Sequence, residues 1–293
     1  MKTRGPFRIG ELSRRTGISP ELLRAWERRY GLLRPARTPG GLRLYSQEDL
    51  ERVQAMQQYL AEGLAAAQAA ALALAAPQPE LGSPPLDPVV VQHELAEALE
   101  TFDESRAQAV LDRLFAFGTV NAVLKGVILP YLRDLGERWE RGQITVAQEH
   151  FASNIMRERL LGLARGWGRG GGPIALLACL PQEQHELGLI AFGLALRSQG
   201  WRIAYLGSDT PLDTLERAAQ AVQPAIIVVS ATLQDRIPPV ASELEALARA
   251  RRVALGGGGV VGSNAASFGV RELHGDPVSE AERIAALGRA ATA

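Results

Sequence analysis

Apolar residues follow two different spacings along this chain. Up to about residue 165 they recur every three or four positions, whereas from residue 174 short apolar runs alternate with amphipathic stretches. The runs predict strands at 174–180, 202–206, 225–229, 252–255 and 270–273, with helices at 186–199, 211–222 and 238–250 between them. Such alternation predicts a doubly wound, Rossmann-like parallel sheet.

The helical spacing between residues 89 and 166 predicts a four-helix bundle. The third of its helices ends soon after Trp139, and a Thr-Val-Ala-Gln capping box at 145–148 begins the next. Glu149 and His150 therefore fall in the first turns of the last helix. We expect these three side chains to converge at one corner of the bundle.

Residues 7–45 predict two short helices and a hairpin. The first helix ends at Gly17, and the Ser-Pro pair at 19–20 supplies the N-cap and first residue of the second. Two short helices with so brief a connection are typical of a helix-turn-helix. The second helix carries Arg24 and Arg28, and an arginine-bearing helix can enter the major groove of DNA.

A wing follows the second helix. Gly40-Gly41 predicts a hairpin tip between two short strands. We expect this hairpin to present Arg37, Arg43 and Tyr45 toward phosphates beside the recognition helix. The following helix begins with a capping box in which Asp49 is the acidic residue, and residues 50–76 supply one helix of modest length.

Residues 76–88 contain five prolines in thirteen positions. Proline interrupts helices and favours an extended, semi-rigid chain, so this segment is expected to be a linker. Four parts are therefore predicted: a DNA-binding head at 1–76, the linker at 77–88, the bundle at 89–166 and the sheet domain at 167–293. Both α and α/β domains are expected in one chain.

Charge is distributed unevenly along the chain. The 293 residues have zero net charge, but residues 1–45 contain eleven basic and three acidic residues, a net of +8, and the rest carries −8. A basic head on an acidic body indicates nucleic-acid binding at one end only. The single cysteine, Cys179, excludes an internal disulfide framework, and with no signal-like segment we expect a cytoplasmic protein without a membrane partner.

The segment that follows the first predicted strand carries candidate ligand chemistry. Pro-Gln-Glu-Gln-His-Glu-Leu-Gly at 181–188 places a histidine at the carboxyl end of a parallel strand, where open α/β sheets bind ligands. Glu183 can hold one ring nitrogen of His185, leaving the other for a metal. The segment contains no second His or Cys, which favours one axial bond to a macrocycle-held metal over a protein-only site. The alternative is an ordinary solvated loop histidine.

This loop resembles the Asp-x-His-x-x-Gly loop of cobalamin-binding domains, with Glu183 in the Asp position. Two further elements of that family follow later strands, Ser230-Ala-Thr232 and Gly256-Gly257. The resemblance implies that His185 is the lower cobalt ligand, that Gly188 lets the cofactor approach, and that the nucleotide tail lies near the serine and glycines. The glycine run lacks the Gly-x-Gly-x-x-Gly order of a dinucleotide loop.

The head resembles the winged-helix head of MerR-family regulators in its Leu-Arg-Ala-Trp-Glu-Arg-Arg-Tyr-Gly segment at 23–31 and the hairpin beyond. That resemblance implies operator contacts by Arg24, Arg28, Arg43 and Tyr45. The Trp-x9-Glu-His spacing, placed in a bundle before a cobalamin domain, resembles CarH/LitR-type photoreceptor repressors. It implies that Trp139, Glu149 and His150 cover the upper face of cobalamin.

One position departs from that pattern. In some light-sensing relatives a histidine follows the tryptophan and takes the vacated upper face of cobalt, but here the residue is Glu140. His150 or water remain as alternatives for that role.

The resemblance implies a light-sensing repressor rather than an enzyme. Adenosylcobalamin, or alternatively methylcobalamin, would support a tetramer that binds double-stranded operator DNA in the dark and releases it after the cobalt–carbon bond is cleaved. Three other classes stay open: a light-independent cobalamin sensor, a corrinoid enzyme subunit, and a drug-sensing regulator that binds no corrin. A corrinoid enzyme needs a substrate domain, for which 293 residues leave no room.

Overall fold

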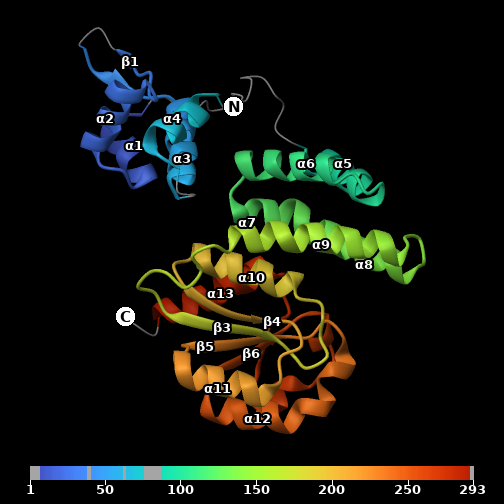
Figure 1. The fold of residues 1–293 in the computed structure, drawn as a ribbon. Helices are drawn as coiled ribbons and strands as arrows, with labels where there is room; N and C mark the ends of the chain where they lie inside the picture. Colours follow the sequence, from blue (N-terminus) through green and yellow to red (C-terminus); the bar gives the residue numbers. More distant parts are fainter. Residues whose placement is uncertain (1–6, 38–40, 62–63, 76–86, 291–293) are drawn as a thin grey trace. The chain divides into compact units, whose positions relative to one another are not determined.

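The computed structural model describes residues 7–37, 41–61, 64–75 and 87–290 (Figure 1). The chain forms two compact units, Met1–Pro84 and Pro85–Ala293, and each is described by itself. Most of the predicted linker, residues 77–86, lies outside the described residues, so the four-part division stays a prediction. Within the described part of the chain, no helix is both long enough and apolar enough to span a membrane.

The head contains the predicted helix-turn-helix and hairpin. Helix α1 (Ile9–Thr16) ends at Gly17 with φ +71°, and α2 (Pro20–Tyr30) begins where the Ser19 hydroxyl accepts a hydrogen bond from the Leu22 N–H at 3.3 Å. Strands β1 (Ala36–Arg37) and β2 (Arg43–Leu44) pair antiparallel. The predicted hairpin tip lies partly in 38–40, outside the described residues.

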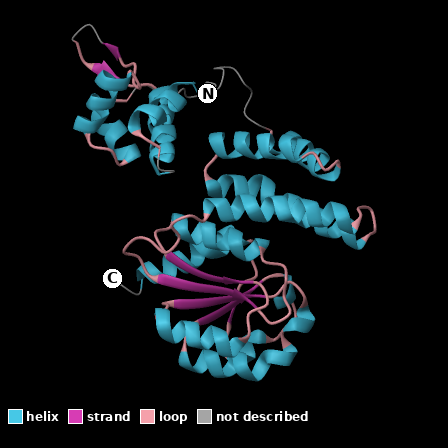
Figure 2. Cartoon of the chain, viewed as in Figure 1, coloured by secondary structure: helices cyan, strands magenta, loops and turns pink. Residues whose placement is uncertain are grey.

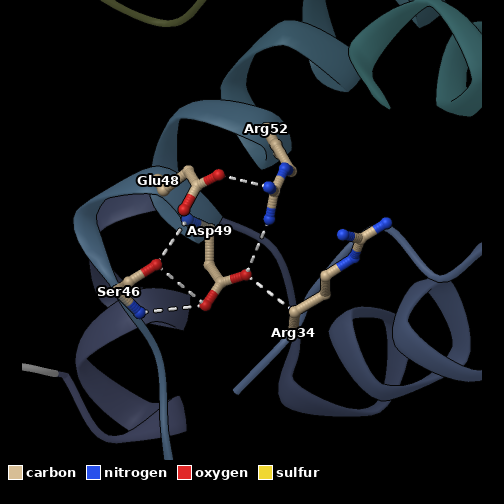
Figure 3. A network of polar contacts seen from close by, with 5 residues as sticks. All are labelled: Arg34, Ser46, Glu48, Asp49 and Arg52. Carbon is tan, nitrogen blue, oxygen red and sulfur yellow. Dashed lines mark hydrogen bonds and ion pairs between the residues drawn. The ribbon is translucent and has the colours of Figure 1, made fainter. Parts of the chain in front are cut away.

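One buried carboxylate joins both ends of the hairpin to the next helix (Figure 3). Asp49 accepts the Arg34 N–H at 2.8 Å with one oxygen and the Ser46 N–H at 2.9 Å with the other, while its own N–H donates to the Ser46 hydroxyl at 3.1 Å. The predicted capping box is therefore confirmed. It also has a second role, because Arg34 and Ser46 precede β1 and follow β2.

Replacing Asp49 with alanine is expected to lower the free energy of unfolding of the head by about 2–3 kcal/mol, because the backbone N–H groups of Arg34 and Ser46 lose their acceptor. Hydrogen exchange of peptides that contain these two residues would measure the loss. Glu48→Ala is the control, since that carboxylate lies nearer the surface and, among the described residues, forms an ion pair only with Arg52. Equal exchange in the two variants would contradict the assignment.

The prediction of one helix over 50–76 was wrong. The structure has two, α3 (Gln47–Ala61) and α4 (Ala66–Ala75), and α4 packs back on α3. Small side chains allow this close return, since Ala69, Ala70 and Ala73 are buried in the core of the head. The alanine-rich stretch therefore completes the head.

The four-helix bundle is confirmed, and its helices are drawn in Figure 2. Its helices are α5 (Pro88–Glu100), α6 (Glu104–Phe117), a third helix from α7 (Val120–Val123) through a π-helical turn (Leu124–Ile128) into α8 (Leu129–Glu140), and α9 (Val146–Leu163). The capping box that starts α9 is present, with the Gln148 N–H donating to the Thr145 hydroxyl at 3.2 Å.

The carboxyl-terminal part is a five-stranded parallel sheet in the order β4-β3-β5-β6-β7. Its strands are β3 (Ile174–Cys179), β4 (Arg202–Gly207), β5 (Ile226–Ser230), β6 (Val253–Gly256) and β7 (Arg271–Glu272). All five predicted strands are present, and no end differs from its predicted position by more than one residue. The doubly wound fold class is confirmed.

Helices cover both faces of this sheet (Figure 1). One face carries α10 (Leu187–Ser198) and α13 (Pro277–Ala290), and the other carries α11 (Leu212–Val222) and α12 (Ala241–Ala250). Alternate residues of β3 point to the two sides: Leu177 packs in the core shared with α10 and the bundle, and Leu176 packs in the core shared with α11 and α12. The bundle packs on α10 through α9 and α7.

Candidate cobalamin site

The candidate loop lies at a reversal of strand order. Strand β3 has β4 on one side and β5 on the other, so the connection from β3 to β4 runs one way across the sheet and the connection from β4 to β5 runs the other way. Open α/β sheets of this 2-1-3-4-5 order bind ligands at such a point, beyond the carboxyl ends of the strands. The segments after β3, β5 and β6 therefore meet where a ligand is expected.

Glu183 connects two of these segments. One carboxylate oxygen accepts hydrogen bonds from the His185 backbone N–H at 2.8 Å and the imidazole Nδ1 at 2.6 Å. The other accepts the N–H groups of Thr232 at 2.6 Å and Leu233 at 3.2 Å, which follow β5. The side chain of Glu183 is 1% exposed, so these bonds hold the loop of His185 against the neighbouring strand end.

The hydrogen bonds of Glu183 decide its charge. Burial by itself raises the pKa of this carboxyl, but the bonds from His185, Thr232 and Leu233 outweigh burial and lower the pKa to about 2. Hydrogen bonding to Glu183 also raises the pKa of His185, against burial, and the charge of Glu149 adds to the rise. With Nδ1 held by a carboxylate, Nε2 of the half-exposed ring is the nitrogen available to a metal.

A cavity of about 400 Å³ begins at His185 and runs along the strand ends. The predicted residues that line it are His185, Gly188, Ser230, Thr232, Gly256 and Gly257. Gly257 has φ +100°, and a Cβ there would lie 2.3 Å from the Ala231 carbonyl oxygen. Only glycine lets these two chain segments close on each other and form the cavity wall.

These features fit a corrinoid with a histidine ligand. Among the described residues no group of three or more His, Cys, Asp and Glu could hold a metal ion. A single imidazole with a fixed tautomer, beside a cavity, is the donor set that a metal already held by a macrocycle requires.

The upper-face candidates lie on the bundle. Trp139 is in the last turn of α8 and is 47% exposed, and Glu140 is exposed beside it. On α9, the Glu149 carboxylate accepts the Ser153 hydroxyl at 2.6 Å, and the His150 side chain is 70% exposed. Glu149 is near enough to His185 to affect its pKa. Among the described residues that line the cavity, neither Trp139 nor His150 is included.

Sequence reasoning missed several residues of this site. Arg133 from α8, His274 and Asp276 before α13 and Glu280 within it also line the cavity. Asp276-Pro277 is an N-cap followed by a proline in the first turn, a signal from which α13 could have been predicted. Arg157, Glu186 and Tyr205 form a polar network beside the loop, and no motif marks it in the sequence.

The DNA-binding candidates lie on the head. Arg24 and Arg28 are exposed on α2. The Arg43 Nε donates to Glu27 at 3.0 Å, and the Tyr45 hydroxyl donates to the same carboxylate at 3.0 Å. The prediction that the hairpin presents Tyr45 was wrong: its ring is fully buried in the core of the head, and burial together with the Glu27 hydrogen bond raises the pKa of Tyr45 to about 12.

Comparison with known proteins identifies the parts of the chain. A family model described as MerR HTH family regulatory protein matches residues 7–75, and two models described as B12 binding domain match residues 91–161 and 173–282. A monomethylamine corrinoid protein of Methanosarcina barkeri superposes with a TM-score of 0.56 at 16% identity, covering 68% of this chain and 99% of that chain, which supports the fold.

Two curated relatives match most of the chain. The HTH-type transcriptional repressor CarH of Myxococcus xanthus is 34% identical over 264 residues, 86% of this chain and 88% of the relative. The repressor CarA of the same organism is 35% identical over 250 residues, 83% of each. This chain therefore belongs to the CarH and CarA family of transcriptional repressors, with a MerR-type helix-turn-helix head and B12-binding domains.

Proposed function

We propose that this chain is a light-sensing repressor that binds adenosylcobalamin, with methylcobalamin as the alternative form. The observation that carries the proposal is the buried Glu183 carboxylate, which fixes the tautomer of His185 at the reversal of strand order. When bound, the cofactor supplies a cobalt–carbon bond that green or shorter-wavelength light cleaves. The rest of the mechanism belongs to this chain's own residues.

His185 would hold the cobalt from the lower side through Nε2. Glu183 keeps a proton on Nδ1, so the lone pair of Nε2 is free to coordinate. Gly188, Ser230, Thr232, Gly256 and Gly257 line the cavity that continues from this nitrogen. They are proposed to hold the nucleotide tail and to leave space for the edge of the macrocycle.

Trp139, Glu149 and His150 are proposed to cover the upper face. A large indole that is nearly half exposed can bury apolar surface against a ligand. Glu149 gives the start of α9 a charge near the loop of His185. Loss of the group that these residues cover would leave Trp139 without a partner and allow the bundle to move on the sheet. Glu140 cannot replace a histidine as a nitrogen ligand.

DNA binding is proposed to involve several heads at once. Arg24 and Arg28 of α2 and Arg43 of the hairpin supply positive charge on each head, and four heads in a dark-state tetramer bind more tightly than one. Illumination is proposed to dissociate the tetramer and to release the operator.

Light scattering after size exclusion tests this proposal on the full chain. Loaded with adenosylcobalamin in the dark, the protein is expected to be a tetramer, and the same sample after green illumination is expected to be smaller. An unchanged size after illumination would contradict light sensing and indicate a light-independent cobalamin sensor. A protein that stays colourless with corrinoids would contradict both.

Replacing Arg24 with alanine is expected to weaken operator binding about tenfold and to reduce the slope of log affinity against log salt by about one, because one phosphate or base contact is lost. Fluorescence anisotropy with operator DNA at several salt concentrations measures both quantities. Arg14→Ala is the control, since Arg14 is exposed on α1 and paired with Glu11. An unaltered salt slope in Arg24→Ala would exclude the contact.

A further inference from the structure

A charged contact crosses the boundary between bundle and sheet. Among the ion pairs formed by the described residues, only that between Arg157 and Glu186 joins these two parts. Arg157 lies on α9, and Glu186 is the N-cap residue of α10, directly after His185. The Arg157 Nε donates to one oxygen of the Glu186 carboxylate.

The carboxylate of Glu186 is almost completely buried, with its side chain 7% exposed. Its second oxygen accepts the hydroxyl of Tyr205, on β4, at 2.5 Å. Burial and this hydrogen bond both raise the pKa of Tyr205, so the hydroxyl stays a donor. A buried charge is tolerated only with such partners, and three separate elements therefore share one carboxylate.

The pair lies between the two parts of the proposed cobalamin site. On one side, Glu186 is adjacent in sequence to His185. On the other, Arg157 is two turns beyond Glu149 on the same helix, and a helix transmits displacement as a rigid body over that length. The other polar side-chain contacts between bundle and sheet among the described residues, Lys125 with Ser279 and Ser198 with Asn121, are exposed and involve neither His185 nor Glu186.

We propose that the Arg157–Glu186 pair couples the position of α9 to the position of the loop that carries His185. Both are positioning residues. The inference rests on the proposed function in assigning the two faces of cobalamin to this loop and to α9. Movement of α9 at the upper face then changes the contact that orders the lower-face loop, and ordering of that loop favours one position of α9.

Hydrogen exchange on the full chain without cobalamin tests the coupling. Arg157→Ala is expected to raise exchange of residues 181–187 about tenfold, because the buried carboxylate loses its cationic partner. Arg159→Ala is the matched control: Arg159 is on the same helix, but it pairs with Asp112 of the bundle at 2.7 Å. Arg157→Lys keeps the charge and is expected to restore part of the protection.

A second measurement tests whether ordering of the loop that carries His185 also orders α9. Adding adenosylcobalamin in the dark is expected to slow exchange of residues 149–157 in the wild type, and this protection is expected to be lost in Arg157→Ala but kept in Arg159→Ala. Equal exchange of residues 181–187 in the two alanine variants would overturn the proposal. If the wild type binds no corrinoid, the proposed function fails, and the comparison without cobalamin still decides the coupling.

Discussion

Replacing His185 with alanine is expected to lower the affinity for cobalamin by about a hundredfold or more. Removing a group that hydrogen-bonds to a metal-binding side chain typically lowers metal affinity about 10–100-fold. The His185→Ala change removes the metal-binding side chain itself, so a larger loss is expected. Titration with adenosylcobalamin in the dark, followed by visible absorption, measures the loss. The absorption of the remaining complex is expected to differ from that of the wild type, because the lower nitrogen ligand is absent.

Two further variants serve as comparisons for His185→Ala. Glu183→Gln keeps the imidazole but weakens the bond that fixes its tautomer, so a smaller loss of about tenfold is expected. His93→Ala removes an exposed histidine of α5 and is expected to leave affinity and absorption unchanged. Wild-type absorption in His185→Ala would rule out this residue as the ligand.

Replacing Gly257 with alanine is expected to disrupt the cavity wall. A Cβ at this position would lie 2.3 Å from the Ala231 carbonyl oxygen, and φ is +100°. The segments after β5 and β6 must then separate, although hydrogen bonds join them at Ala231 N–H to Gly256 O, 3.0 Å, and Gly259 N–H to Ala231 O, 2.9 Å. We expect unfolding to become easier by about 3 kcal/mol and cobalamin affinity to fall at least about tenfold.

Gly262→Ala separates the effect of the steric clash from the effect of the positive φ. Gly262 also has a positive φ, +76°, but the nearest atom to its added Cβ would be the Gln234 side-chain nitrogen at 3.5 Å. That variant is expected to lose only about 1 kcal/mol from the backbone conformation, with cobalamin binding retained. Thermal unfolding and the same cobalamin titration compare the two variants. Equal cobalamin affinity in both would show that the cavity does not depend on the close approach at Gly257.

The fold could be predicted largely because its signals are local. Continuous apolar runs specify the strands, and capping residues such as Thr145 and Asp49 mark where helices begin. The prediction for 50–76 failed because alanine supports a long helix and a tightly packed return equally well. Contacts of α4 with the rest of the head favour the packed return over a long helix, and these contacts cannot be predicted from the spacing of apolar residues.

The site was predicted less completely, for a related reason. A loop histidine with a nearby carboxylate can be read from spacing, and the structure brings Glu183 and His185 within 2.6 Å. The bonds from Glu183 to the segment after β5 join residues about fifty positions apart, and the Arg157–Glu186 pair spans 29 positions. Tyr45 was misplaced because an aromatic residue with a hydroxyl suits both a core and a phosphate contact.

The central claim is that the imidazole of His185, with Nδ1 held by Glu183, is the lower ligand of cobalt. Electron paramagnetic resonance of the cobalt(II) form, prepared with isotope-labelled histidine nitrogen, tests it most directly. The account predicts that the nitrogen splitting of the cobalt signal follows the histidine label and disappears in His185→Ala. Nitrogen splitting that does not change with the histidine label, as expected if the cofactor's own benzimidazole binds cobalt, would contradict the claim.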